Sequence, residues 1–293
     1  MKTSRITTSL PFIILVAGLL LATRDVLRAL DRDHGDDDDN TIKVMAEDLE
    51  ILPLVGAVGP ESIAFDPDGR GPYVGVSDGR IVRWDRDRLR WVDFAVTSPN
   101  RRFLEATVTG DDTGTLMKYD PTTKETTTLL SNLTFANGVS VSKNGVFVLA
   151  LESTRCRVNK YWLKTSKAGT SEVVTQLPGF PDNIRMNLKG EFWVGIYSRR
   201  SKFLEWILSF RRLGNIFVRL PFEPLKLVSS FISRKSVGMA VKLSEEGDVV
   251  LQVLEEKSGK LRFVSEVMEN EGDLWFGSVV MPFVSVFRNH TVT

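Results

Sequence analysis

Four residues with side-chain oxygen atoms are the strongest candidates for chemistry in this sequence: Glu61, Asn137, Asp182 and Asn183. Each lies at the start of a short apolar segment that has the pattern of a β-strand. Two carboxylates and two amides form a set of hard oxygen donors, which suits Ca²⁺. Because Asn-Gly and Asp-Asn are also common turn dipeptides, ordinary turns are the alternative interpretation.

Other kinds of site are disfavoured by the composition. Both histidines, His34 and His290, lie near the ends of the chain, so histidine-based catalysis or metal binding is not expected. Cys156 is the single cysteine, which excludes an intrachain disulfide and is expected to be a buried, inert thiol. The net charge of +1 argues against a broad basic surface, so no nucleic-acid partner is expected.

The strands that would position the four oxygen donors come from a repeated unit. This unit is an apolar strand, a turn with a polar residue and Gly, and an aromatic-rich strand. Its four copies are Ile63–Val76, Val139–Ala150, Ile184–Val194 and Val264–Phe276. The turn glycines Gly145 and Gly190 are 45 residues apart, which is an interval typical of propeller blades.

A second unit alternates with the first and begins with Gly before a strand that ends in an aromatic residue. Its copies are Gly79–Asp85, Gly114–Asp120 and, more loosely, Arg157–Trp162. Inner hairpins from the first unit and outer hairpins from the second would make four-stranded blades. The sequence therefore predicts an all-β propeller in which the starts of the inner strands converge on a central channel.

The repeats do not tile a complete propeller, because a segment is missing near Asn100. The outer units that begin at Gly79 and Gly114 follow one another, and residues 97–111 are too few to hold an inner unit between them. About four blades' worth of strands remain. A shortened protein, an alternative transcript and a gene-model error would each produce this gap.

The N-terminal residues have the pattern of a targeting segment. Lys2 and Arg5 precede the apolar run of residues 10–22, so residues 1–24 are predicted to form an apolar helix that is a signal peptide or a signal anchor. Residues 25–45 are a polar, acidic linker. The predicted localisation is the secretory pathway, with the vacuole, the endoplasmic reticulum and secretion as destinations.

Entry into this pathway would make two glycosylation sequons meaningful, one at Asn132 and one at Asn289. Residues 199–235 interrupt the β pattern and are predicted to be a helical insertion that packs over one propeller face. The alternative is a basic amphipathic helix at 199–219 that contacts a membrane, to which residues 10–22 could also attach the protein.

Several motifs together carry a family resemblance: Gly59–Ile63, Thr113–Thr126, Ala136–Val139, Lys160–Leu163, Leu177–Ile184 and Gly272–Gly277. In these motifs the chain resembles plant strictosidine synthase-like proteins, over a domain of residues 46–290. The resemblance implies a six-bladed propeller related to calcium-dependent lactonases and phosphotriesterases. Family members carry a further segment of more than one blade at the place where the repeats fail here, near Asn100.

The resemblance also implies a metal site, because metal-binding relatives place Glu, Asn and Asp at positions matching Glu61, Asn137 and Asp182. Another Asn ligand would come from the missing segment, so Ca²⁺ binding is expected to be weak or lost. A true strictosidine synthase uses a Glu as acid and base, and the matching position holds Arg262 or Leu261. A guanidinium cannot act as a base at neutral pH, so no catalytic residue is assigned.

Three functions follow from these observations. The first is an ancestral calcium-dependent hydrolysis of small esters or lactones, impaired here by the missing segment. The second is condensation of an amine with an aldehyde in alkaloid biosynthesis, as in strictosidine synthase. The third is a non-catalytic binding module or a fragment. In the first two the partner is a small-molecule substrate whose identity is not specified by the sequence.

Overall fold

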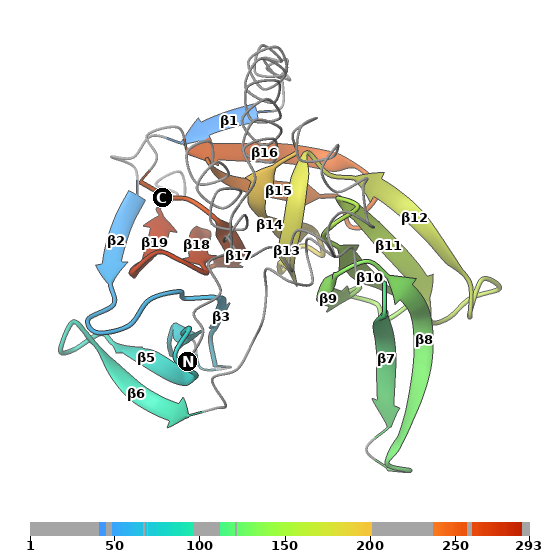
Figure 1. Ribbon diagram of the computed structural model, residues 1–293, viewed down its shortest axis with the longest axis horizontal. Coiled ribbons are helices and arrows are strands. Elements are labelled where there is room, and N and C mark those ends of the chain that lie inside the picture. The colour runs from blue at the N-terminus through green and yellow to red at the C-terminus, as the bar shows by residue number, and fades with distance from the viewer. Residues whose placement is uncertain are drawn as a thin grey trace, which may run out of the picture.

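The computed structural model describes residues 41–44, 49–66, 68, 70–96, 112–120, 122–200, 237–256 and 260–288 (Figure 1). Every regular element among these residues is a β-strand, which confirms the predicted all-β class. The predicted N-terminal apolar helix and the helical insertion near 199–235 lie outside the described residues. The described part of the chain has no helix of the length and hydropathy that a membrane crossing requires.

Sixteen strands form four blades, each an antiparallel group of four. One blade contains β9 (Ala136–Val141), β10 (Phe147–Glu152), β11 (Arg157–Trp162) and β12 (Ser171–Gln176). The next contains β13 (Gly179–Met186), β14 (Phe192–Arg199), β15 (Gly238–Leu243) and β16 (Val250–Glu256), with β1 (Thr41–Val44) parallel to its edge. The third contains β17 (Val264–Asn270), β18 (Asp273–Ser278), β19 (Phe283–Phe287) and β2 (Leu49–Pro53). The fourth contains β3 (Ser62–Ala64), β4 (Tyr73–Gly75), β5 (Arg80–Asp85) and β6 (Arg90–Val96).

The innermost strands of the four blades lie side by side in the order β9, β13, β17 and β3. A separate apolar cluster fills each interface between neighbouring blades. Phe147 and Phe192 pack between the first two blades, Trp193 and Phe276 between the next two, and Trp275 joins the blade of β17 to that of β3. This radial packing of four-stranded sheets confirms the predicted propeller architecture.

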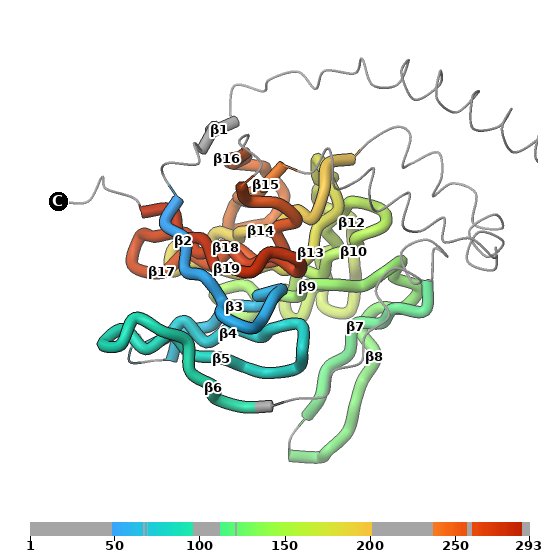
Figure 2. The backbone as a smooth tube through the Cα atoms, turned by 60° about the vertical axis from the view of Figure 1, so that its left-hand side comes forward, coloured from blue at the N-terminus to red at the C-terminus, as the bar shows by residue number. Residues whose placement is uncertain are grey.

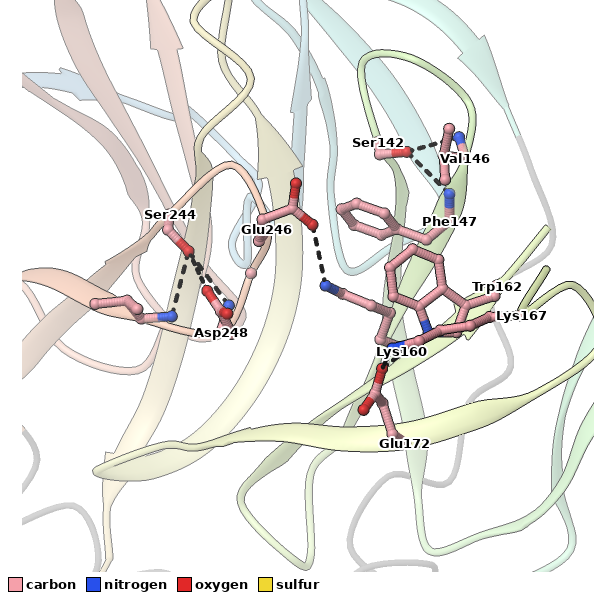
Figure 3. Close-up of polar contacts among 12 residues, drawn as sticks. Ser142, Val146, Phe147, Lys160, Trp162, Lys167, Glu172, Ser244, Glu246 and Asp248 are labelled. Carbon is pink, nitrogen blue, oxygen red and sulfur yellow. Dashed lines mark hydrogen bonds and ion pairs between the residues drawn. The ribbon is translucent and has the colours of Figure 1, made fainter. Parts of the chain in front are cut away.

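Two turns inside the blades are stabilised in the same way, by hydrogen bonds from backbone N–H groups to a serine hydroxyl oxygen. Ser142 Oγ accepts hydrogen bonds from the backbone N–H groups of Val146 and Phe147, and Gly145 follows with φ of 64°. Glycine tolerates this left-handed conformation, which a tight hairpin requires. Ser244 Oγ accepts in the same way from Asp248 and Val249, as Figure 3 shows in part.

Polar contacts add to the apolar packing between the blades. The Lys160 side chain is almost completely buried, with its ammonium 4.3 Å from the centroid of the Phe147 ring and 4.9 Å from that of Trp162 (Figure 3). Its Nζ also lies 3.4 Å from Glu246 Oε2 in the neighbouring blade. Aromatic faces and a carboxylate thus compensate the buried charge and link β11 to the β15–β16 turn.

The chain closes its last blade with its own early strand. β2 pairs antiparallel with β19, with Ile51 opposite Ser285. The Arg288 guanidinium forms ion pairs with Glu50 of β2 and Asp273 of β18. Residues more than 200 positions apart are thereby joined in one sheet.

The remaining hairpin belongs to none of the four blades, as expected for an incomplete propeller, whereas the predicted gap near Asn100 lies outside the described residues. β7 (Gly114–Asp120) and β8 (Glu125–Leu133) form a sheet of only two strands where each other blade has four. Figures 1 and 2 show this hairpin projecting away from the blades. The described residues therefore form four blades and one separate two-stranded hairpin.

Candidate functional site

The sequence-predicted oxygen donors lie at or near inner strands, although two of them lie in the middle of a strand rather than at its start. Glu61 directly precedes β3, Asn137 is the second residue of β9, and Asp182 and Asn183 lie in β13. Asp182 is buried, whereas Glu61, Asn137 and Asn183 are half-buried. The inner strands pack side by side, β9 against β13, β13 against β17 and β17 against β3.

Three inner strands meet at the backbone carbonyl of Glu61. Asn183 Nδ2 of β13 donates to this oxygen at 3.4 Å, and Ser265 Oγ of β17 donates to it at 2.9 Å. The Glu61 residue at the start of β3 is thus tied to two other blades. Residues of three blades are therefore connected by hydrogen bonds at this carbonyl.

Asn137 is tied to the neighbouring blade by a short relay. Its Nδ2 donates to Ser153 Oγ at 3.2 Å, and Ser153 Oγ donates to the Pro181 carbonyl at 2.5 Å. Pro181 is adjacent to Asp182. The relay therefore fixes the orientation of the Asn137 amide relative to the β13 part of the site.

Glycines allow the inner strands to approach closely at the site. A Cβ on Gly138 would lie 2.7 Å from backbone atoms of Asp182 and Asn183, and one on Gly195 would lie 2.7 Å from the Ser265 carbonyl carbon. A Cβ on Gly277 would lie 2.5 Å from the Pro60 carbonyl oxygen. Each of these three glycines thus lets its strand approach the backbone of the neighbouring blade more closely than a residue with a side chain would allow.

We expect Gly138→Ala to lower the free energy of unfolding by about 1–3 kcal/mol, because its methyl group meets rigid backbone. The same displacement would move Asn137 away from β13 and reduce any ligand affinity of the site. Gly75→Ala in β4 is the matched control, since nothing lies within 4 Å of its added Cβ. Urea denaturation of both variants tests this; equal losses would show that close packing at Gly138 is unimportant.

Sequence reasoning missed the role of Glu266 as the ionisable group inside the site. Its side chain in β17 is completely buried and forms an ion pair with Arg185 of β13. Burial raises the pKa of Glu266 to about 7; the Arg185 guanidinium opposes this rise and the Glu61 carboxylate adds to it. The carboxyl therefore titrates near neutral pH.

A phenol also lies beside the site. Burial raises the pKa of Tyr197 to about 12, and the Asp182 carboxylate contributes to this rise. The Tyr197 ring packs against Phe263, with centroids 4.8 Å apart. Tyr197 accordingly remains a neutral hydroxyl at physiological pH.

The donor types at the site fit Ca²⁺, but their number is small. Asn137 and Asn183 both use the amide nitrogen for protein acceptors, so each amide oxygen is the atom available to a cation. No three acidic, His or Cys side chains in the described part of the chain are grouped closely enough to hold a metal. Ca²⁺ usually takes six to eight oxygen ligands. Among the described residues, the side chains of Glu61, Asn137, Asp182 and Asn183 are the candidate contributors to such a shell.

The other sequence-predicted positions lie elsewhere. Leu261 is buried, and the carbonyl of Arg262 accepts a hydrogen bond from Ser278 Oγ at 2.7 Å. Asn132 is exposed in β8, as a glycosylation acceptor must be, although Thr134 of its sequon is buried. Asn289 lies outside the described residues.

Four-stranded antiparallel blades whose inner strands pack side by side define a propeller protein. A similar fold is found in regucalcin, a calcium-binding protein from Agrobacterium tumefaciens, with a TM-score of 0.53 and 9% sequence identity. The match covers 85% of this chain and 95% of that protein. At this identity the likeness establishes the fold alone.

Sequence comparison identifies the family. The strictosidine synthase family model matches residues 77–166, and the model for the strictosidine synthase-like N-terminal region matches residues 47–84. Protein STRICTOSIDINE SYNTHASE-LIKE 10 of Arabidopsis thaliana is 37% identical, with 81% of this chain and 87% of the relative covered. STRICTOSIDINE SYNTHASE-LIKE 3 of Arabidopsis thaliana is 35% identical, and the match covers 83% of this chain and 85% of that relative. The chain belongs to the strictosidine synthase-like family.

The same comparison supports an internal gap. The match to STRICTOSIDINE SYNTHASE-LIKE 10 extends over 327 positions, whereas 81% of the 293 residues is about 237. About 90 aligned positions therefore have no residue of this chain opposite them. That length exceeds one blade, such as Ala136–Gln176, which agrees with the loss of more than half a blade beside β7.

Proposed function

We propose that this chain derives from a calcium-dependent hydrolase of small esters or lactones, and that it retains part of the metal-binding channel with impaired activity. The observation that supports the proposal is that Glu61, Asn137, Asp182 and Asn183 lie in or directly before inner strands of different blades, with Asn183 Nδ2 bonded to the Glu61 carbonyl. Their carboxylate and amide oxygens would hold the cation. A bound Ca²⁺ would polarise an ester or lactone carbonyl.

The protein's own residues would orient the metal ligands and exclude water. Hydrogen bonds from Asn183 and Ser265 to the Glu61 carbonyl fix the start of β3 in the channel. The hydrogen bonds from Asn137 to Ser153 and from Ser153 to the Pro181 carbonyl fix β9 relative to β13. Activity is reduced in this proposal because the strands missing between β6 and β7 leave that part of the channel without its wall and its ligands.

Titration calorimetry should detect Ca²⁺ binding no tighter than about 10⁻⁴–10⁻³ M, the range of weak calcium modules. Glu61→Gln should abolish the heat, because it removes a carboxylate from an already incomplete set of ligands. Glu125→Gln, which removes an exposed carboxylate of β8, should bind as the wild type does. A dissociation constant near 10⁻⁷ M, or binding unaffected by Glu61→Gln, would refute the proposed site.

Hydrolysis of aryl esters and γ-lactones by the same samples tests the activity. We expect slow, Ca²⁺-dependent turnover that Glu61→Gln eliminates. Metal binding without turnover would instead support a non-catalytic binding module. Turnover that a chelator does not affect would contradict a role of the metal in hydrolysis.

The condensing reaction receives less support from the geometry. Condensation requires a carboxyl group that reaches the amine of the substrate. Glu266 is the ionisable carboxyl with a pKa near 7, but its side chain is completely buried and paired with Arg185. It therefore acts within the protein rather than on a ligand in the channel.

A further inference from the structure

One edge of β7 pairs with no other strand that the structure describes. Within the described residues β7 has one strand neighbour, β8, and each of the four blades has four or more strands. An isolated two-stranded hairpin is only marginally stable in water. Its edge strand also presents unpaired backbone N–H and C=O groups that can pair with another strand.

Two large side chains on the same face of β7 are more than half exposed. Met117 is 55% and Tyr119 is 59% exposed, and residues two apart on a strand share a face. Figures 1 and 2 show the hairpin projecting from the blades. The strand thus combines an open hydrogen-bonding edge with an apolar stripe.

We propose that β7 pairs with β7 of a second copy of this chain, antiparallel and about a two-fold axis at Met117. The product is a four-stranded sheet in the order β8-β7-β7-β8, which matches the strand number of the blades in this molecule. Both half-blades become complete without any other partner. A two-fold interface requires a self-complementary edge.

The sequence of β7 is self-complementary about this axis. Centring on Met117 pairs the whole strand Gly114–Asp120, because the same number of residues lies on either side. Met117 then faces its counterpart, and Tyr119 of each copy faces Thr115 of the other, which buries the apolar stripe. Lys118 lies opposite Leu116 rather than opposite the other lysine, so the pairing avoids like-charge repulsion.

Single-cysteine cross-linking of the full chain tests this register. Residues directly opposite in an antiparallel pair have Cα atoms about 4.5–5.5 Å apart, within disulfide reach. Met117→Cys should therefore form a covalent dimer under mild oxidation. Tyr119→Cys alone should not, since equivalent residues would lie roughly 13 Å apart along the strands.

Mixing Thr115→Cys chains with Tyr119→Cys chains should give cross-linked heterodimers. The wild type, whose single Cys156 is buried, is the control and should stay unlinked. Sedimentation of the wild type should give the mass of a dimer at tens of micromolar protein. A monomer in sedimentation, or a dimer that Met117→Cys fails to cross-link, overturns the proposal.

Discussion

Replacing Glu152 with alanine is expected to lower the free energy of unfolding by about 3–5 kcal/mol, which is a large part of the stability of a typical domain. Glu152 ends β10 and its side chain is completely buried. Its Oε1 accepts from the backbone N–H of Thr134 at 2.9 Å, and its Oε2 accepts from Arg157 Nε at 2.6 Å. Alanine would leave both donors without this partner.

The pKa of Glu152 shows that the ionised form is the stable one. Burial acts most strongly and favours the neutral acid, but the hydrogen bonds from Thr134 and Arg157 together outweigh it and hold the pKa below its ordinary value. A lowered folded-state pKa stabilises the protein above the unfolded-state value and less as the pH falls through the folded value. The loss in Glu152→Ala should therefore be largest at neutral pH.

Urea denaturation at pH 7 measures this loss, with Glu172→Ala as the matched control in the same blade. Glu172 accepts from Trp162 Nε1 at 2.8 Å, but its side chain is 47% exposed. Exposed contacts of this kind contribute about 0–1 kcal/mol. A Glu152→Ala loss no greater than that of Glu172→Ala would contradict the importance of the buried network.

The second large effect concerns Glu266 and should appear as a change in pH dependence. Burial raises its pKa from an ordinary 4.5 to about 7 in the folded protein. Between these values the unfolded chain has lost the proton that the folded chain keeps, so stability falls as the pH rises through this window. This pKa shift corresponds to a fall of on the order of 3 kcal/mol in the free energy of unfolding between pH 4.5 and pH 7.

Glu266→Gln removes the titrating group and should remove this decline. Unfolding free energies of wild type and variant at intervals from pH 4.5 to 8 give a difference curve in which all other groups cancel. We expect the free energy of unfolding of the variant to increase relative to that of the wild type as the pH rises. A flat difference curve would mean that Arg185 keeps Glu266 ionised throughout, and Glu125→Gln provides the exposed control.

Much of the fold could be predicted because local chemistry repeats along the chain. The turn at Gly145 falls between β9 and β10, as the first repeated unit predicted, and Arg157–Trp162 is β11. The missing segment was also visible, since two outer hairpins in succession cannot form a blade. The turns and strands depend on residues that are close together in the sequence, and the gap on the spacing of the repeated units.

The parts that could not be predicted depend on contacts between distant residues. Nothing in Leu49–Pro53 indicates that this strand pairs with β19, because the partner lies at the other end of the chain. Glu266 follows an ordinary strand pattern, and its raised pKa arises from burial between the blades, to which the Glu61 carboxylate adds and which Arg185 opposes. The oxygen donors were identifiable by type, but their mutual orientation comes from hydrogen bonds to Ser153 and to the Glu61 carbonyl.

The order of contacts β9, β13, β17 and β3 has a further consequence for how the molecule comes apart. In a closed propeller every blade has two neighbours, so no blade can leave without breaking two interfaces. The described contacts here form an open arc, with the blade of β3 at one end and the β7–β8 hairpin beyond β9 at the other. Such an arc resembles a linear repeat array, in which unfolding begins at the terminal units and moves inward.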